Sequence, residues 1–462
     1  MRVVDPERLG RQQPEEIRNS VRSACEKKVA ARETSLAENI RDPASLRDLA
    51  GRLRQHVLDH LDEYLDRAEE RLESNGVQVH WAEDAAQARE IIAGICRTAG
   101  ARLIVKGKSM VSEEIELNHH LEACGFEVVE TDLGEFVVQL DGDRPSHIVT
   151  PIIHKSKEQI AQLFERKGLG EHTQDPEALT MQARRHLRRI FEQADVGITG
   201  ANFVVAESGR IVTVSNEGNV RFCSTLPRVH IALTGVEKIV AREDDLAVLL
   251  KMLARSSTGQ DLTVYTQFLG AVRSKEDPDG SQERHLIFLD NGRTEILGGR
   301  YREMLRCIRC GACLNVCPVY RTVTGHSYGS VYPGPMGAIL SPLLGAGETR
   351  RNYAVLPKAS SLCAACEEVC PVAIPIPKML LSLRQEIGRG APLSGNVPNF
   401  GLWGLLVASP RLWRWSLRVG GWTGWRIVKM LPVGALRAWL QARELPEWPR
   451  ESFREAWRKR KR

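Results

Sequence analysis

The feature that most constrains this chain is a set of seven cysteines between residues 307 and 370 of its 462 residues. Four of them follow the spacing Cys-x2-Cys-x2-Cys-x3-Cys-Pro, and the other three follow Cys-x2-Cys-x3-Cys-Pro. In the first run, three thiolates can surround one cubane iron–sulfur cluster, whereas the fourth cannot reach that cluster and ligates a second one. The proline after each run stops the local helix. The spacing therefore predicts a ferredoxin-type segment with two clusters.

The two runs align on their prolines. Because the last cysteine of each run ligates the cluster of the other run, a ligand set can be assigned to each cluster. The predicted ligands are Cys307, Cys310, Cys313 and Cys370 for cluster 1, and Cys317, Cys363 and Cys366 for cluster 2. The position opposite Cys307 is Ser360. Because a serine hydroxyl is a poor ligand for soft metals, cluster 2 is expected to have three firm thiolates. It would then be a 3Fe-4S cluster, or a 4Fe-4S cubane with a non-cysteine fourth ligand.

Zinc ions and disulfide bonds are the other common uses of clustered cysteines. A zinc site takes four ligands in two Cys-x2-Cys pairs, which does not account for a longer run repeated in part. The N-terminus shows no apolar signal segment, so we expect a cytoplasmic protein, in which structural disulfides are rare. Four of the eleven cysteines stand alone and are expected to be small buried side chains: Cys25, Cys96, Cys124 and Cys223.

Upstream of the cysteine runs, strand and helix patterns alternate. We predict strands at 77–81, 102–105, 126–130, 196–205, 210–214, 230–233 and 285–289, and helices at 85–99, 111–124 and 177–194. Such alternation implies an α/β domain with a parallel sheet covered on both faces. The predicted organisation is a helical N-terminal segment (1–72), an α/β domain (73–300), a mainly α-helical two-cluster domain (301–390) and a helical C-terminal region rich in Trp and Arg (391–462).

The C-terminal region is strongly basic. After residue 400 lie eight of the nine tryptophans and fourteen Arg and Lys against four Glu, although the whole chain has a net charge of only +6. The rest of the chain is therefore slightly acidic, which argues against nucleic acid as a partner. Interleaved Trp and Arg suit a peripheral contact with the inner face of an anionic membrane. Packing on the cluster domain or on a partner subunit is the alternative. No apolar run approaches the about 20 residues of a membrane span.

Three polar features of the α/β domain have both a functional and a structural interpretation. Residues 106–109 (Lys-Gly-Lys-Ser) join a strand to a helix, where they could hold an anion or cap the helix. His147 and His154 flank Pro151 and could contact a substrate. The Gly-containing turns at 206–209 and 216–219 could be functional or could be hairpin turns.

With the cysteine runs behind an α/β domain, the chain resembles the lactate utilization protein B family over nearly its full length. The matching motifs are residues 105–118 (VKGKSMVSEEIELN), 198–203 (ITGANF) with 206–209 (AESG), and 332–342 (YPGPMGAILSP). The resemblance implies that the α/β domain is a LUD domain, similar in fold to sugar-phosphate isomerases and CoA transferases. It also implies that the seven cysteines are the cluster ligands of the family.

Members of this family are implicated in oxidising L-lactate to pyruvate beside a Cys-rich subunit and a second LUD-domain protein, passing electrons without binding lactate. No flavin or nicotinamide fingerprint is present, so we expect an electron-transfer component rather than a complete dehydrogenase. Arg302, Arg306 and Arg309 are expected to raise the potential of cluster 1. One alternative is an iron–sulfur subunit for another 2-hydroxy acid such as glycolate. The other is a CoA-transferase-like enzyme with Glu207 as nucleophile and structural clusters.

Overall fold

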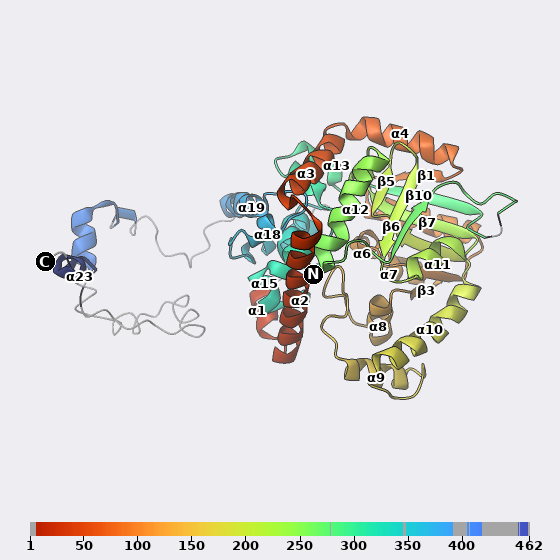
Figure 1. Cartoon of the computed structure of the whole chain (residues 1–462), viewed down its shortest axis with the longest axis horizontal. Helices are drawn as coiled ribbons and strands as arrows, with labels where there is room; N and C mark the ends of the chain where they lie inside the picture. The colour runs from red at the N-terminus through yellow and green to blue at the C-terminus, as the bar shows by residue number, and fades with distance from the viewer. Residues whose placement is uncertain are drawn as a thin grey trace. The chain divides into compact units, whose positions relative to one another are not determined.

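The computed structural model of the chain describes residues 6–277, 279–344, 348–390, 404–405, 407–417, 451 and 453–460. The chain divides into two compact units, Met1–Gln385 and Glu386–Arg462. The first unit contains all eleven cysteines. Figure 1 shows its helical N-terminal segment, its sheets and its cluster segment.

Four helices form the N-terminal segment: α1 (Pro6–Arg11), α2 (Glu15–Asn39), α3 (Pro43–Asp59) and α4 (Leu61–Ser74). The start of α3 is fixed by Asp42, whose carboxylate accepts a hydrogen bond from the backbone N–H of Ser45, with Pro43 in the first turn. These helices bury their apolar faces against the rest of the unit. Val21 of α2 lies in the core of the cluster segment, whereas Leu72 of α4 lies against the main sheet.

The α/β domain is built on six parallel strands in the order β1-β10-β7-β4-β2-β3. They are β1 (Gln78–Ala82), β2 (Leu103–Lys106), β3 (Glu127–Glu130), β4 (Val196–Gly200), β7 (Val229–Gly235) and β10 (Glu283–Leu289). Helices α5 (Ala85–Thr98) and α7 (Leu117–Ala123) cover one face, and α4 with a second sheet covers the other. All seven residues of β7 are buried, as expected for a central strand covered on both faces. The predicted parallel α/β fold is confirmed.

The remaining α/β elements complete the two layers. The second sheet has four strands in the order β8-β5-β6-β9: β8 (Ile239–Val240), β5 (Phe203–Val205), β6 (Arg210–Ser215) and β9 (Tyr265–Leu269). The remaining helices are α6 (Met110–Glu114), α8 (Leu133–Asp141), α9 (Lys157–Arg166), α10 (Pro176–Gln193), α11 (Asn219–Thr225), η1 (Val236–Lys238), α12 (Glu243–Thr258) and α13 (Arg293–Gly298). Figure 1 shows α8, α9 and α10 together, beyond the strand β3 at one edge of the main sheet.

Two predicted elements are each divided in the structure. The segment 196–205, predicted as one strand, forms β4 of the parallel sheet and then β5 of the second sheet. Asn202 redirects the chain, because its side-chain oxygen accepts the backbone N–H of Val214 in β6 at 2.9 Å. The helix predicted at 111–124 breaks at Glu116, whose φ of 52° is left-handed, and so becomes α6 and α7. Hydrophobic spacing continues across both breaks, so the sequence pattern does not reveal them.

Short helices make up the cluster segment: η2 (Arg302–Arg306), α14 (Ala312–Val316), α15 (Pro318–Val323), η3 (His326–Tyr328), α16 (Gly334–Leu340), α17 (Glu348–Tyr353), η4 (Leu356–Lys358), α18 (Ala365–Glu368) and α19 (Ile376–Gly390). The segment shares one hydrophobic core with α2, α3 and α12. In Figure 1, α15 lies beside α1 and α2. The cysteine runs are therefore held by the N-terminal helices as well as by their own short helices.

The second unit is described only in part. Residues 410–417 are helical, and α23 spans Phe453–Arg460. Trp413, Trp415 and Trp457 are exposed. Trp403, Trp422 and Trp425, which belong to the predicted membrane contact, lie outside the described residues. Within the described ranges, no helix combines the length and apolar character that crossing a membrane requires.

Candidate iron–sulfur site

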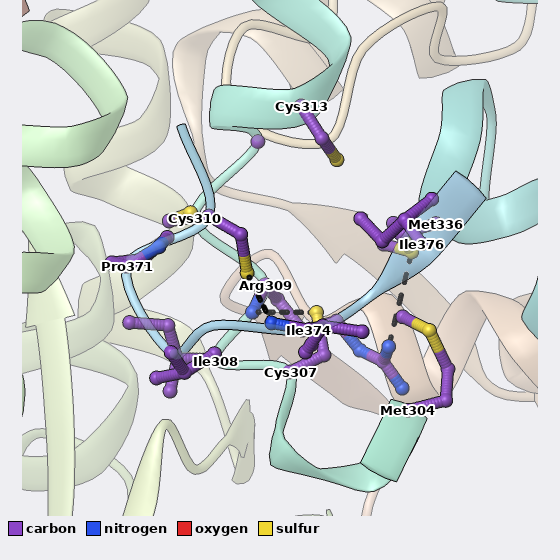
Figure 2. Close-up of a pocket in the computed structure, with 13 residues that line it drawn as sticks. Met304, Cys307, Ile308, Arg309, Cys310, Cys313, Met336, Pro371, Ile374 and Ile376 are labelled. Carbon is purple, nitrogen blue, oxygen red and sulfur yellow. Dashed lines mark hydrogen bonds between the residues drawn. The ribbon is translucent and has the colours of Figure 1, made fainter. Parts of the chain in front are cut away.

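Four cysteines from the two runs line one cavity. Cys307, Cys310 and Cys313 come from the first run, and Cys370 comes from the second. Figure 2 shows Cys307, Cys310 and Cys313 around this cavity. The remaining lining is mainly apolar and includes Met304, Ile308, Met336, Val372, Ile374 and Ile376. The structure therefore brings together the residues of the set predicted for cluster 1, including the one from the distant run.

The two runs share a local backbone conformation. In the first run, Arg309 and Gly311 have left-handed φ values of 59° and 79°. Leu362 and Ala364, at the equivalent positions of the second run, have φ values of 57° and 70°. Left-handed residues reverse the chain within a few residues, which lets successive thiols converge on one point. Glycine is unstrained there, whereas the other three residues must be held by their surroundings.

Ser360 occupies the place in the second run that Cys307 has in the first. The backbone N–H of Arg309 donates to Cys307 Sγ at 3.4 Å, and that of Leu362 donates to Ser360 Oγ at 3.2 Å. The two side chains thus accept the same hydrogen bond from the residue two positions later. This equivalence supports the alignment of the runs.

The last cysteines of the two runs also accept backbone hydrogen bonds. Tyr320 N–H donates to Cys317 Sγ and Ile374 N–H donates to Cys370 Sγ, each at 3.4 Å. Cys317 is the N-cap of α15, which begins at Pro318. Donors aimed at sulfur stabilise negative charge on a thiolate and on a cluster that it ligates.

The electrostatics of the cavity favour a bound cationic group. Burial raises the pKa of Cys310 to about 12 and that of Cys370 to about 11, and raises the pKa of Cys313 well above its usual range. The neighbouring thiolates raise the pKa of Cys313 further. These three buried thiols do not ionise together unless iron or another metal supplies compensating charge. The donor set, the apolar lining and the sulfur-directed N–H groups therefore fit an iron–sulfur cluster.

The three remaining cysteines of the runs form a second group. Burial raises the pKa of Cys366 to about 12, and the nearby charges of Cys317 and Cys363 add to this shift. Cys317 and Cys366 are buried, whereas Cys363 is exposed. The three cysteines of the set predicted for cluster 2 are thus close enough to one another for their charges to interact, and one of them reaches the surface.

Of the solitary cysteines, Cys96, Cys124 and Cys223 lie in the α/β domain, whereas Cys25 of α2 shares the hydrophobic core of the cluster segment and lies near Cys317. Cys25, Cys96 and Cys223 are buried, as expected for small apolar side chains, and Cys124 is half-buried. Burial raises the pKa of Cys96 and of Cys223 to about 12. These thiols are therefore neutral at physiological pH.

The Lys-Gly-Lys-Ser motif makes internal contacts. Ser109 caps α6 by accepting a hydrogen bond from the backbone N–H of Ser112. Lys106 is fully buried, with its Nζ 2.6 Å from Glu130 Oε1 and 2.9 Å from Glu113 Oε1. These contacts favour the capping interpretation over an anion site.

His147 and His154 link a loop of the α/β domain to the cluster segment. His147 Nδ1 accepts the backbone N–H groups of Val149 and Thr150, and its Nε2 lies 3.3 Å from Asn315 Oδ1 in α14. Burial holds the pKa of His147 well below its usual range. A neutral ring with both nitrogens engaged points to a structural contact.

His154 belongs to a polar group with Asp143 and His326, whose ligand-type atoms lie within 4.8 Å of one another. His154 Nε2 is 3.0 Å from Asp143 Oδ2. Lys155 Nζ already pairs with the same oxygen at 2.8 Å. We interpret the group as a hydrogen-bonded contact between the loop and η3.

The two predicted turns differ. Residues 206–209 do form the hairpin turn between β5 and β6. Within it, Glu207 Oε2 accepts the backbone N–H of Glu243 at 3.1 Å, at the start of α12. Residues 216–219 instead lead from β6 into α11, so they are not a hairpin turn. The Glu207 carboxylate therefore has a structural use, which disfavours the transferase alternative.

Sequence reasoning missed a buried charge network beside Cys307. Arg293 pairs with Glu114 and with Glu237, each at 2.8 Å. The hydroxyl of Tyr332 donates to Glu114 at 2.6 Å, and the guanidinium of Arg309 lies 4.7 Å from the centre of the Tyr332 ring. These residues are single charges or aromatic groups scattered over more than 200 positions, and no local sequence signal connects them.

Comparisons with known proteins define the class. The LUD domain family matches residues 65–296, and the 4Fe-4S dicluster domain family matches residues 303–374. The chain is therefore a LUD-domain protein with an iron–sulfur segment of the 4Fe-4S dicluster family. It is 44% identical over 454 residues to lactate utilization protein B of Bacillus licheniformis, which covers 95% of this chain and 93% of that protein. It belongs to the lactate utilization protein B family.

Other relatives have similar coverage. The uncharacterized electron transport protein YkgF of Escherichia coli is 42% identical over 457 residues, covering 97% of this chain and 95% of that protein. Lactate utilization protein B of Bacillus subtilis is 44% identical over 448 residues, covering 94% and 91%. A crystal structure of a DUF162 family protein from Deinococcus radiodurans is 15% identical with a TM-score of 0.29, covering 50% of this chain and 98% of that chain.

The crossed ligand sets predict which signals are lost together. Cys370→Ser should remove the EPR signal of cluster 1, as Cys313→Ser does, because both cysteines line the same cavity. Cys317→Ser should remove the signal of cluster 2 instead. Cys124→Ser, outside both groups, is the matched control and should leave both signals intact. If Cys317→Ser and Cys313→Ser lose the same signal, the crossed assignment is wrong.

The equivalence of Ser360 and Cys307 predicts a gain of iron on Ser360→Cys. The new thiolate would close the fourth corner of cluster 2, raising the iron content from roughly seven to roughly eight per chain and removing any three-iron EPR signal. Ser361→Cys, one position away and exposed, is the control that should change neither quantity. Iron analysis and EPR of the oxidised protein measure the effect. An unchanged Ser360→Cys protein would contradict an open corner.

Proposed function

We propose that this chain is the iron–sulfur electron-transfer subunit of a system that oxidises L-lactate to pyruvate. The observation that carries the proposal is the meeting of four cysteines from two distant runs around one apolar cavity. The other three cysteines are close enough to interact electrostatically. The names of its relatives, lactate utilization protein B and electron transport protein, support it. In this proposal, Cys307, Cys310, Cys313 and Cys370 hold cluster 1, and Cys317, Cys363 and Cys366 hold cluster 2.

When bound, the clusters supply one-electron redox chemistry. The residues of the chain hold them and set their surroundings. Met304, Met336 and Ile376 line the cavity around the first set and exclude water from it. Backbone N–H groups donate to the sulfur atoms of Cys307, Cys317 and Cys370, which favours the reduced state. Because Cys363 is exposed, the second set is accessible to a docked protein.

The proposed partners are a Cys-rich subunit and a second LUD-domain protein of the same system.

Two observations favour electron transfer over group transfer by the α/β domain itself. Glu207, the nucleophile that a transferase would need, caps α12 through Glu243. Lys106 is neutralised by Glu113 and Glu130 within the domain. The substrate would then be bound by a partner.

This division of labour predicts that the chain alone does not respond to lactate. With both clusters in place, L-lactate should leave its absorption and EPR spectra unchanged, and the two partner proteins together should make reduction lactate-dependent. Glycolate in place of lactate tests the alternative 2-hydroxy acid. Appreciable lactate oxidation by the single polypeptide with an artificial acceptor would contradict the proposal.

We further propose that the second unit makes a peripheral contact with an anionic membrane. Its described helical residues 410–417 expose Trp413, Trp415 and Leu417 beside Arg411 and Arg414. Exposed tryptophan next to arginine suits the interface of a bilayer with acidic headgroups.

The membrane contact is tested by flotation with liposomes. The full chain should float with vesicles that contain an anionic lipid, and a chain truncated after Val397 should not, since the Trp and Arg residues are then removed. Neutral vesicles are the control and should recruit both forms weakly. Equal flotation of both forms, or of neither, would rule this contact out.

A further inference from the structure

Arg54, in the middle of α3, lies far from the cysteine runs in sequence but next to them in the structure. Its side chain is 1% exposed. Its Nε donates to the backbone carbonyl of Arg306 at 3.3 Å, and its Nη2 donates to that of Leu305 at 3.1 Å. These two carbonyls immediately precede Cys307. The guanidinium therefore holds the start of the first cysteine run.

The same guanidinium also reaches the α/β domain. Its Nη1 donates to the carbonyl of Ile239 in β8 at 2.6 Å, and its Nη2 donates to the carbonyl of Glu237 in η1. All of the acceptors are neutral carbonyls. Among the described residues, no carboxylate lies within ion-pair distance of Arg54. A buried arginine remains charged at any physiological pH, so its positive charge requires compensation from elsewhere.

The buried network nearby does not supply that compensation. The glutamates of the network, Glu114 and Glu237, are each engaged by Arg293, and Glu237 also lies 3.5 Å from Arg309. Lys238, also buried, donates through its Nζ to the backbone carbonyl of Cys307 at 3.4 Å. Three arginines and this lysine therefore face two glutamates, which leaves an excess of positive charge beside the cavity of Cys307. A cubane held by four thiolates has a net negative charge that grows by one on reduction. The negative charge of such a cluster, held beside Cys307, would compensate the positive charge of Arg54.

We propose that Arg54 is the electrostatic partner of cluster 1, so that the N-terminal helical segment helps to set the reduction potential of that cluster. The inference rests on the proposed function, because it takes Cys307, Cys310, Cys313 and Cys370 as ligands of cluster 1. Arg54 is a positioning residue that acts through its charge and its hold on the loop. A fixed cation in a low-dielectric interior stabilises the reduced cluster more than the oxidised one. Its effect is thus to raise the potential.

The test is an EPR-monitored redox titration of the full chain with both clusters present. Arg54→Met should shift the equilibrium of cluster 1 at least tenfold toward the oxidised state, which is about 59 mV for one electron. Glu237→Gln removes a negative charge from the network and should shift it the opposite way. Cluster 2, in the same sample, is the internal reference and should not move.

Two further variants separate charge from structure. Arg54→Lys keeps the charge and loses the planar fork, so its cluster 1 should titrate close to the wild-type potential even if the protein is less stable. Arg52→Met removes an exposed arginine of the same helix and is the matched control, with no expected shift. If Arg54→Met fails to hold cluster 1, the raised potential of Glu237→Gln beside the unchanged potential of Arg54→Lys still decides.

The outcomes are distinct. If wild-type protein shows no cluster 1 signal, the proposed function fails. Two results would overturn this inference when cluster 1 is present. One is a wild-type potential in Glu237→Gln, and the other is a wild-type potential in an Arg54→Met protein that is only less stable. In either case Arg54 merely supports the loop. Opposite shifts of cluster 1 in Arg54→Met and Glu237→Gln, with Arg52→Met unchanged, establish it.

Discussion

The paired charges of Arg293 and Glu237 join the end of the parallel sheet to the cysteine loop, and the geometry of the candidate site depends on them. Glu237 lies in η1, directly after the central strand β7, and is 1% exposed. Arg293, fully buried, starts α13 and holds Glu237 and Glu114 at once. Because removing one partner of a buried ion pair leaves an uncompensated charge, each of these contacts constrains the others. The loop of Cys307 and Cys310 therefore rests on the sheet through Arg309.

This network also explains local features of the α/β domain that look irregular in isolation. β7 ends at Gly235, where a Cβ would stand 2.0 Å from Glu237 Oε2 and 2.4 Å from Arg293 Nε. No larger residue fits that position without displacing the ion pair. The break at Glu116 ends α6 just after Glu114, whose carboxylate meets Arg293. Both features, 119 positions apart, serve one contact beside the first set of cysteines.

The sequence predicts some parts of this structure in detail and others not at all. The cysteine spacing is local and chemically specific, so it predicts the two cysteine groups. It also singles out Ser360, which makes the same backbone hydrogen bond as Cys307. Alternating hydrophobic runs predict the parallel sheet, because β7 and its neighbours are buried on both faces. The same hydrophobic pattern does not show that the chain leaves the parallel sheet at Asn202 and enters a second sheet. That change of direction depends on the Asn202 side chain, which accepts a hydrogen bond from the backbone N–H of Val214. Arg54 is beyond sequence reasoning, because a lone arginine on a polar helix is ordinarily solvated.

Several polar side chains of the α/β domain are bonded to other parts of the same chain, and this indicates what the domain does. At the carboxyl end of a parallel sheet, side chains commonly face a ligand. Here Lys106, at the end of β2, is neutralised by Glu113 and Glu130, while Glu237, just beyond β7, faces the loop of Cys307 through Arg309. Glu207, in the turn after β5, caps a helix. Each of these groups is engaged by another part of the same chain, and such a domain is suited to supporting a cluster and tuning its charge. We therefore regard it as a scaffold for electron transfer, which accounts for its presence in a chain whose redox-active groups lie in another segment.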